Sequence, residues 1–172
     1  MKLILKDKLL SLRGHFEVHD EEGNVVFKAE GKSMFKEDLY IYDKEGKEVG
    51  SVKKSSKLLS NKYEFYEGET LIGCIEGKFT LLKPNYHLEL KEWDDIQGDA
   101  SGYNYAITKG DTTIALLNEK PMSFTNRYIM EIADEKDALY VLMITLALTS
   151  DEDIGTAVIV AGAAAVAAIV LL

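Results

Sequence analysis

Residues 138–148 read ALYVLMITLAL, a stretch with no charged side chain. Only Tyr140 and Thr145 carry a polar side-chain atom. A surface helix keeps one polar face, whereas this stretch is apolar all round, so as a helix it must be buried on every side. It would be roughly 16 Å long at ~1.5 Å per residue, about half the thickness of a bilayer core. The stretch therefore predicts a helix enclosed by the rest of the protein.

The residues on either side of this stretch predict where the helix begins and ends. Asp134 can cap the free backbone N–H groups of the first turn, and Glu135 and Asp137 lie where the helix dipole favours negative charge. A polar run over residues 149–153, TSDED, follows the apolar stretch. We therefore expect a central helix over residues 135–149, within a domain that covers residues 1–150.

An aromatic residue that opens an alternating run recurs before the helix at intervals of 19 to 24 residues. These runs begin at Phe16, Tyr40, Tyr63, Tyr86, Tyr105 and Tyr128. A near-constant period indicates a repeated supersecondary unit. Most units hold two β-favouring runs joined by an acidic turn with a glycine, and glycine supplies the positive φ that a tight hairpin requires. Each unit is therefore predicted to be a β-hairpin, and the fourth is irregular because residues 93–99 replace the simple turn and strand.

The number of predicted strands decides the fold class. Five hairpins, one strand over residues 3–10 and one over residues 128–132 give twelve strands. Consecutive antiparallel strands leave two open edges unless the sheet closes into a barrel. A barrel of that size is too wide to be filled by its own side chains. The sequence therefore predicts a β-barrel of about 12 antiparallel up-and-down strands, closed around the hydrophobic helix.

Composition excludes some classes of function. The chain has 172 residues, 47% hydrophobic and 28% charged, which fits one globular domain with a real core. Its net charge of −9 argues against nucleic acid as a partner, because duplex binding needs a basic face. Cys74 is the only cysteine, which excludes an internal disulfide and fits a reducing compartment. Charges at Lys2, Lys6 and Asp7 interrupt any signal-peptide core, so we expect a cytoplasmic protein.

The sequence resembles the LURP-one-related (YxjI-type) proteins, which belong with the Tubby C-terminal domain and the phospholipid scramblases. The resemblance covers residues 1–150 and rests on the hairpin repeats, on residues 78–84 (KFTLLKP), on Trp93 with Gly98, Asp99 and Tyr105, and on residues 128–134 (YIMEIAD) leading into the helix. It implies a twelve-strand barrel around a central helix. It also implies phospholipid or membrane contact, and it brings no catalytic residues.

A second uncharged run, IGTAVIVAGAAAVAAIVLL, covers residues 154–172 and is not part of that resemblance. As an additional apolar C-terminal helix it would be roughly 28 Å long, close to the hydrocarbon thickness of a membrane. Its residues are mostly small, no Lys or Arg flanks it, and three acidic residues precede it. The run is open to four interpretations: a helix packed on the barrel or in a homo-oligomer interface, a membrane anchor, a disordered tail, or the segment that fills the barrel in place of residues 138–148.

Side chains with catalytic or metal-binding chemistry do not form a recognisable set in the sequence. His15 and His19 would lie ~13 Å apart on one strand, too far to share a metal, and His87 belongs to another unit. Cys74 lies in an apolar run and is expected to be buried. The acidic turns lack the spacing of a calcium loop. We therefore expect no catalytic, cofactor-binding or metal-binding residues.

In an up-and-down barrel all hairpin turns lie at one end and all connectors between units at the other. The turns are acidic, whereas the connectors and adjoining strand ends are basic and include the lipid-contact candidates Lys36, Lys57, Lys62, Lys83, Lys120 and Arg127. The connectors also carry apolar pairs such as Met34-Phe35 and Leu58-Leu59. Basic residues around apolar ones are what an anionic membrane surface attracts. The alternative is that the apolar residues fold inward and plug the barrel while the lysines only solubilise it.

Three functions follow from this organisation. The first is a non-enzymatic barrel that contacts phospholipid through its basic connectors and is membrane-associated, with residues 154–172 assisting. The second is a soluble protein-binding or scaffold module that uses the C-terminal helix as its interface. An enzyme or small-molecule carrier is the third, and it is disfavoured because the helix occupies the interior and no nucleophile with a base is visible.

Overall fold

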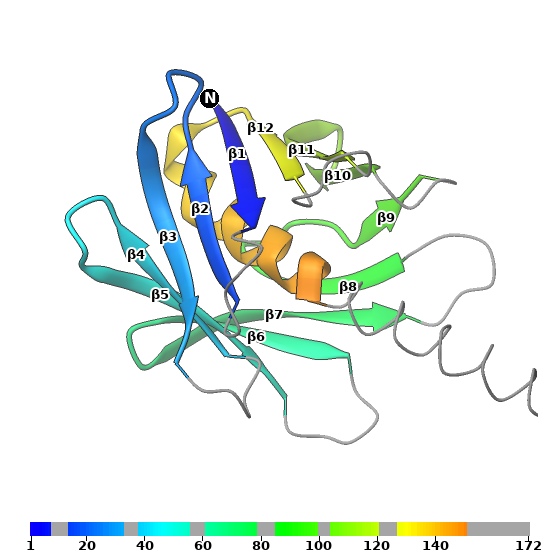
Figure 1. The fold of residues 1–172 in the computed structure, drawn as a ribbon. Helices are drawn as coiled ribbons and strands as arrows, with labels where there is room; N and C mark the ends of the chain where they lie inside the picture. The colour runs from blue at the N-terminus through cyan, green and yellow to red at the C-terminus, as the bar shows by residue number, and fades with distance from the viewer. Residues whose placement is uncertain are drawn as a thin grey trace, which may run out of the picture.

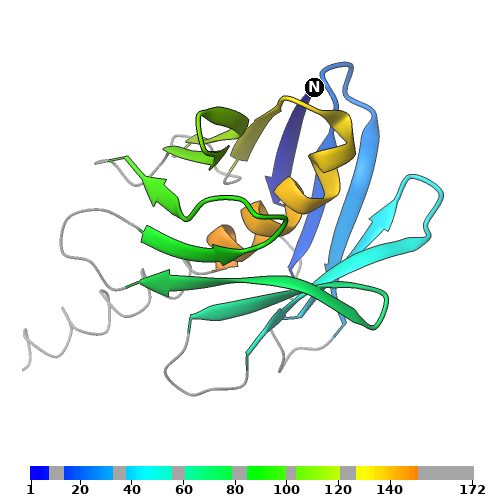
Figure 2. The same ribbon diagram turned by 180° about the vertical axis from the view of Figure 1, so that it is seen from behind.

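The computed structural model describes residues 1–7, 14–32, 38–55, 61–78, 85–99, 104–120 and 127–150. These residues form twelve antiparallel strands in one closed barrel, in which strands adjacent in sequence pair and β1 pairs with β12 (Figures 1 and 2). The strands are β1 (Lys2–Asp7), β2 (His15–His19), β3 (Val25–Gly31), β4 (Leu39–Asp43), β5 (Glu48–Lys54), β6 (Lys62–Glu67), β7 (Thr70–Lys78), β8 (Asn85–Glu89), β9 (Ile96–Gly98), β10 (Asn104–Lys109), β11 (Thr112–Lys120) and β12 (Arg127–Ile132). The predicted twelve-strand barrel is confirmed.

The repeated unit is a hairpin, and four of the hairpins share the same irregularity. In four hairpins the pairing register shifts by one residue close to the turn. The shift falls between two consecutive residues of the first strand: Val18 and His19, Ile41 and Tyr42, Phe65 and Tyr66, or Ile107 and Thr108. A bulge of this kind bends a strand and increases its twist, which helps a sheet to close. Gly23 and Gly46, with φ of 88° and 81°, take the left-handed conformation in two of the turns. The fourth unit is irregular as predicted, because β9 has only three residues.

The central helix lies inside the barrel (Figure 1). A 3₁₀ turn, η1 (Glu135–Asp137), comes first, and an α-helix follows over residues 138–150. The side chain of Asp134 accepts a hydrogen bond from the backbone N of Lys136, as predicted for the cap. No side chain from Val141 to Leu148 is more than 1% exposed. The predicted buried helix is therefore confirmed, with residues 138–150 inside the barrel. Residues 154–172 lie outside the described residues.

The barrel wall makes room for the helix at one glycine. Gly50 faces inward on β5, and a Cβ at this position would overlap Cε of Met143 and lie 3.0 Å from the carbonyl oxygen of Tyr66. Any larger residue would therefore push the wall and the helix apart. The rest of the inner wall is built from alternate strand residues, such as Phe16 and Val18 on β2. Helix and wall form one apolar cluster.

Candidate functional site

The hairpin turns and the start of the central helix lie at one end of the barrel, which we call the hairpin end (Figure 1). The other end, where β1 ends and β12 begins, we call the basic end. Acidic side chains predominate among the described residues of the hairpin end: Asp20, Glu21, Glu22, Asp43, Glu45, Glu67, Glu69, Asp94, Asp111, Asp134 and Glu135. The predicted segregation of acidic turns at one end is therefore present in the fold.

Several carboxylates of the hairpin end organise their own turns. Asp20 accepts hydrogen bonds from the backbone N of Asn24 at 2.8 Å and from its side-chain amide at 3.0 Å. These bonds lower the pKa of Asp20, with the side chain of Asn24 as the largest cause. Asp43 accepts in the same way from the backbone N of Glu45 and Lys47. The lowered pKa keeps the carboxylate of Asp20 ionised at neutral pH. The acidic side chains together give the hairpin end a negative potential.

A cluster around Lys91 closes the hairpin end over the start of the helix. Its ammonium lies 2.6 Å from the carboxylate of Asp137, which is only 8% exposed. The same ammonium lies 4.2 Å from the ring centre of Tyr140, and this ring meets Trp93 edge to face. Lys91 has a positive φ of 51°, a conformation that costs a non-glycine residue ~1 kcal/mol or more. The turn after β8 is therefore held in a strained form that directs Lys91 to the helix.

The basic end carries a row of three basic residues, which lie on the first strand of the barrel and on its last two strands. Lys6 of β1 pairs in register with Arg127 of β12, and Arg127 pairs with Lys120 of β11. Three basic residues therefore occupy neighbouring positions on three adjacent strands. Like charges in adjacent cross-strand positions repel and destabilise a sheet. Lys6 also pairs in register with Glu17 of β2, so an acidic residue occupies the next position beside the row.

The structure describes only some of the predicted lipid-contact residues. Lys120 ends β11 and Arg127 begins β12, so the fold brings these two together. Lys36, Lys57 and Lys83 lie outside the described residues. Lys6 is missing from the predicted set, because its place beside Arg127 follows only from the pairing of the first strand with the last. That pairing was itself implied by barrel closure, so the signal was present in the sequence.

Lys62 lies on the outer wall and interacts with its neighbours on β7 and β8. Its pKa is raised by Cys74 first, and also by Glu89 and Glu76. The positive charge of Lys62 is therefore partly balanced by these neighbours on the outer wall. Cys74 is buried as predicted, but its partners are polar, since its Sγ lies 3.5 Å from Glu89. Burial is the largest cause of its raised pKa, so the thiol stays protonated at neutral pH and is a poor nucleophile.

The histidines are held by carboxylates on the outer wall. Nδ1 of His87 lies 2.8 Å from Asp95, and its Nε2 lies 3.2 Å from Glu89. His15 lies 3.6 Å from Glu30 on the neighbouring strand. Among the described residues, no group of three or more His, Cys, Asp or Glu side chains has the arrangement of a metal site.

Tyrosines and lysines share the outer face of β4 to β6. The ammonium of Lys32 lies 3.7 Å from the ring centre of Tyr40, and that of Lys53 lies 4.5 Å from the ring centre of Tyr66. Such contacts contribute ~0.5–1 kcal/mol at exposed sites. Sequence reasoning missed this surface, because the tyrosines were counted only as markers of the repeat. It places two more cations on the wall, of which Lys32 is also paired with Glu48 at 3.0 Å.

Within the part of the chain that the structure describes, no helix combines the length and the apolar character that a membrane crossing requires.

Comparisons with known proteins agree with this fold. The chain is 27% identical over 158 residues to the uncharacterised protein YxjI of Bacillus subtilis (strain 168), a match that covers 89% of this chain and 97% of that protein. A crystal structure of an Arabidopsis thaliana protein superposes with a TM-score of 0.60 at 14% sequence identity, covering 88% of this chain and 91% of that one. This likeness concerns the fold alone.

The sequence model of the LURP-one-related family matches residues 1–149, which are all the strands and nearly the whole described helix. The match stops before the apolar run 154–172, where the predicted resemblance also ended. The chain is therefore a YxjI-type protein that belongs to the LURP-one-related family.

Proposed function

We propose that this protein is a non-enzymatic barrel that contacts anionic phospholipid surfaces through its basic end. The contact residues are Lys120 and Arg127 with their neighbour Lys6, together with the connector lysines Lys36, Lys57 and Lys83 and, more weakly, Lys62. A cytoplasmic protein of this kind would associate with membranes reversibly. Each basic residue near an anionic surface contributes ~1 kcal/mol.

The row Lys6, Arg127 and Lys120 carries the proposal. Its three residues occupy adjacent register positions, where like charges disfavour one another. Glu17 of β2 occupies the register position on the other side of Lys6 and offsets this repulsion only at that end of the row. A surface with a dense negative charge would relieve that repulsion on contact. Lys62 supports the proposal less, because Glu76 and Glu89 already attract its ammonium.

The distribution of charge would also orient the barrel. The hairpin end carries predominantly carboxylates and is repelled by anionic headgroups, whereas the opposite end is attracted. A molecule of net charge −9 is thus able to approach an anionic surface in one direction only. Salt screens these interactions, with a Debye length of about 10 Å at 0.1 M and about 3 Å at 1 M, so binding should weaken as ionic strength rises.

The filled interior supports a non-enzymatic role. Small-molecule sites in wide barrels usually lie inside, but here residues 138–150 and the inner wall pack into one apolar cluster. The thiol of Cys74 is kept protonated by burial.

Flotation with vesicles containing phosphatidylserine tests the proposal. The triple variant Lys6→Glu, Lys120→Glu and Arg127→Glu should lose most of the binding that the unaltered chain shows. A matched control reverses three exposed lysines elsewhere, Lys28→Glu, Lys44→Glu and Lys47→Glu, and should bind almost normally. Equal loss in both variants would mean that net charge alone matters. Unchanged binding of the first variant, or no binding by the unaltered chain, would refute the proposal.

A further inference from the structure

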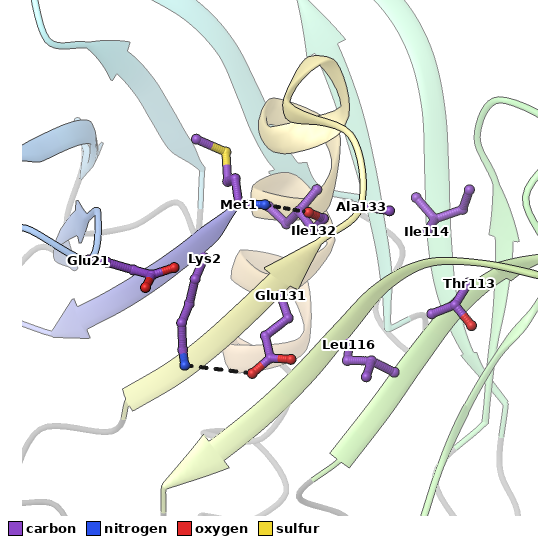
Figure 3. A pocket seen from close by; sticks show the side chains of 9 residues that line it. All are labelled: Met1, Lys2, Glu21, Thr113, Ile114, Leu116, Glu131, Ile132 and Ala133. Carbon is purple, nitrogen blue, oxygen red and sulfur yellow. Dashed lines mark hydrogen bonds and ion pairs between the residues drawn. The ribbon is translucent and has the colours of Figure 1, made fainter.

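The barrel wall has its shortest strand at β9, in the irregular fourth unit. The pair β1 and β12, which closes the barrel, is joined at five register positions and is bridged on its outer face by Lys2 and Glu131 at 3.7 Å (Figure 3). By contrast, β9 pairs with β8 at two positions and with β10 at two. Both neighbours extend beyond these pairs, β8 to Glu89 and β10 to Lys109. The segment that precedes β9, residues 90–95, lies between them, and we call it the wall turn.

The wall turn is attached to both neighbouring strands through its last two residues. The backbone N of Asp94 donates to the carbonyl oxygen of Thr108 at 2.8 Å. The carboxylate of Asp94 accepts from the hydroxyl of Thr108 at 2.9 Å and from the backbone N of Gly110 at 2.7 Å. On the other side, the carboxylate of Asp95 accepts from the backbone N of Leu88 at 3.1 Å. Side-chain oxygens thus replace strand pairing that β9 is too short to provide.

The inner side of the wall turn contacts the start of the central helix. Trp93 is only 7% exposed and meets Tyr140 edge to face, and Lys91 lies 2.6 Å from the buried carboxylate of Asp137. Lys91 and Glu92 both have a positive φ, of 51° and 58°. Backbone strain of this kind persists only where the surroundings fix the chain. A contact that fixes the wall turn from outside therefore also fixes the start of the helix.

One histidine holds the wall turn from outside. Nδ1 of His87 lies 2.8 Å from the same Asp95 oxygen that accepts from Leu88, and its Nε2 lies 3.2 Å from Glu89. A neutral imidazole has a single N–H and donates to one of these carboxylates, whereas a protonated imidazole donates to both. Hydrogen bonds between charged groups are also roughly twice as strong as neutral ones. Protonation therefore strengthens the hold of His87 on Asp95.

The charges that face His87 are mostly negative. Besides the two carboxylates that it contacts, Glu76 of β7 faces it in register, and Lys62 of β6 lies beyond Glu76. The neutral thiol of Cys74 donates to Glu89. The hydrogen bond from His87 is the largest cause of the lowered pKa of Glu89, so this carboxylate is ionised where an imidazole ordinarily titrates, near pH ~6.5. Among the described residues of these strands, three carboxylates therefore face the imidazole against one ammonium.

We propose that His87 is a pH-sensitive switch, which fixes the wall turn, and through it the start of the central helix, when its imidazole is protonated. The added hold is present below the pH range in which the imidazole titrates and is lost as the pH rises through that range. The start of the helix is therefore held more firmly at pH ~6 than at pH ~8. This switch does not depend on the phospholipid contact proposed above.

Trp93 is the only tryptophan of the chain, so its fluorescence reports on the wall turn. Acrylamide is uncharged, and its quenching of the indole measures how often the turn opens. In the full-length chain the quenching constant should rise about twofold or more between pH ~6 and pH ~8. His87→Gln cannot gain a proton and should show the higher value at both pH values. His87→Arg stays charged and can reach both carboxylates, so it should show the lower value at both.

The matched control replaces the other two histidines, His15→Gln with His19→Gln, and should respond to pH as the unaltered chain does. Hydrogen exchange gives a second readout at equal pH. The Leu88 amide should exchange several-fold faster in His87→Gln than in the unaltered chain at pH ~6, and almost equally at pH ~8. The inference is wrong if the quenching of the unaltered chain does not change with pH, if His87→Gln keeps that change, or if the control loses it. Equal exchange of the Leu88 amide in the two chains at the lower pH would also overturn it.

Discussion

The inner and outer faces of the same strands carry residues of opposite character. On β1, Leu3 and Leu5 are at most 1% exposed, whereas Lys2 and Lys6 on the outer face reach toward solvent. On β12, Met130 is fully buried, whereas its neighbour Glu131 is exposed. Alternation along a strand directs successive side chains to opposite faces, so one segment of sequence contributes to the core and to the surface.

This difference indicates where sequence changes matter. The inner face packs against the helix in one apolar cluster, so a change in size or charge there finds little compensation. The outer face contacts water, which solvates altered side chains. We therefore expect mutational effects to fall from the centre of the barrel to its surface. The following predictions test that order.

The largest effect is expected for a charge in the helix. Leu142→Asp, or Ile144→Asp, places an unpaired carboxylate where the native side chain is fully buried, at a cost of several kcal/mol. That is a large part of the ~5–15 kcal/mol that stabilises a typical domain, so soluble expression should be lost. Leu116→Asp makes the same chemical change on the outer face and should express normally. Comparable melting temperatures for the inner and outer variants would mean that the helix is not enclosed.

A smaller effect is expected for added volume at Gly50. The new methyl group of Gly50→Ala would overlap Met143, and its other close neighbour is backbone that cannot easily move. Overpacking of this kind costs ~1–3 kcal/mol, measurable by urea unfolding. In a Met143→Ala background the same substitution should cost less, because the overlapping methyl of Met143 is gone. Additive effects of the two changes would show that wall and helix do not meet at this point.

The smallest effect is expected at the end of the barrel, where core and surface meet. Lys91→Ala leaves the buried carboxylate of Asp137 without its partner. Because Lys91 itself is 35% exposed, the cost should be ~1–2 kcal/mol, less than for a fully buried pair. Adding Asp137→Asn should recover part of the loss. Lys109→Ala removes the exposed pair with Glu92 at 2.8 Å and should leave the free energy of unfolding almost unchanged. Equal losses of unfolding free energy in the two lysine variants would mean that the buried pair stabilises the fold no more than the exposed pair.

Much of the candidate site followed from local sequence, and the rest required closure of the barrel. Lys120 and Arg127 were assigned to the basic end from the order of turns and connectors alone. Lys6 was missed although it pairs with Arg127, because the two residues are far apart in the chain and meet only where the first and last strands join. Lys91 and Asp137 were missed for a similar reason, since they are 46 positions apart and a strained turn brings them together.

The sequence by itself determined the twelve strands, their hairpins and the buried helix. These features depend on local periodicity, on glycine in tight turns and on an apolar stretch that has no polar face to expose. The tertiary structure decided which outward-facing residues become neighbours, because cross-strand register depends on bulges and on closure rather than on any single segment. It also decided the partners of Lys62 and Lys91. A charged side chain at the surface has many neighbours within reach, and only the folded chain selects among them.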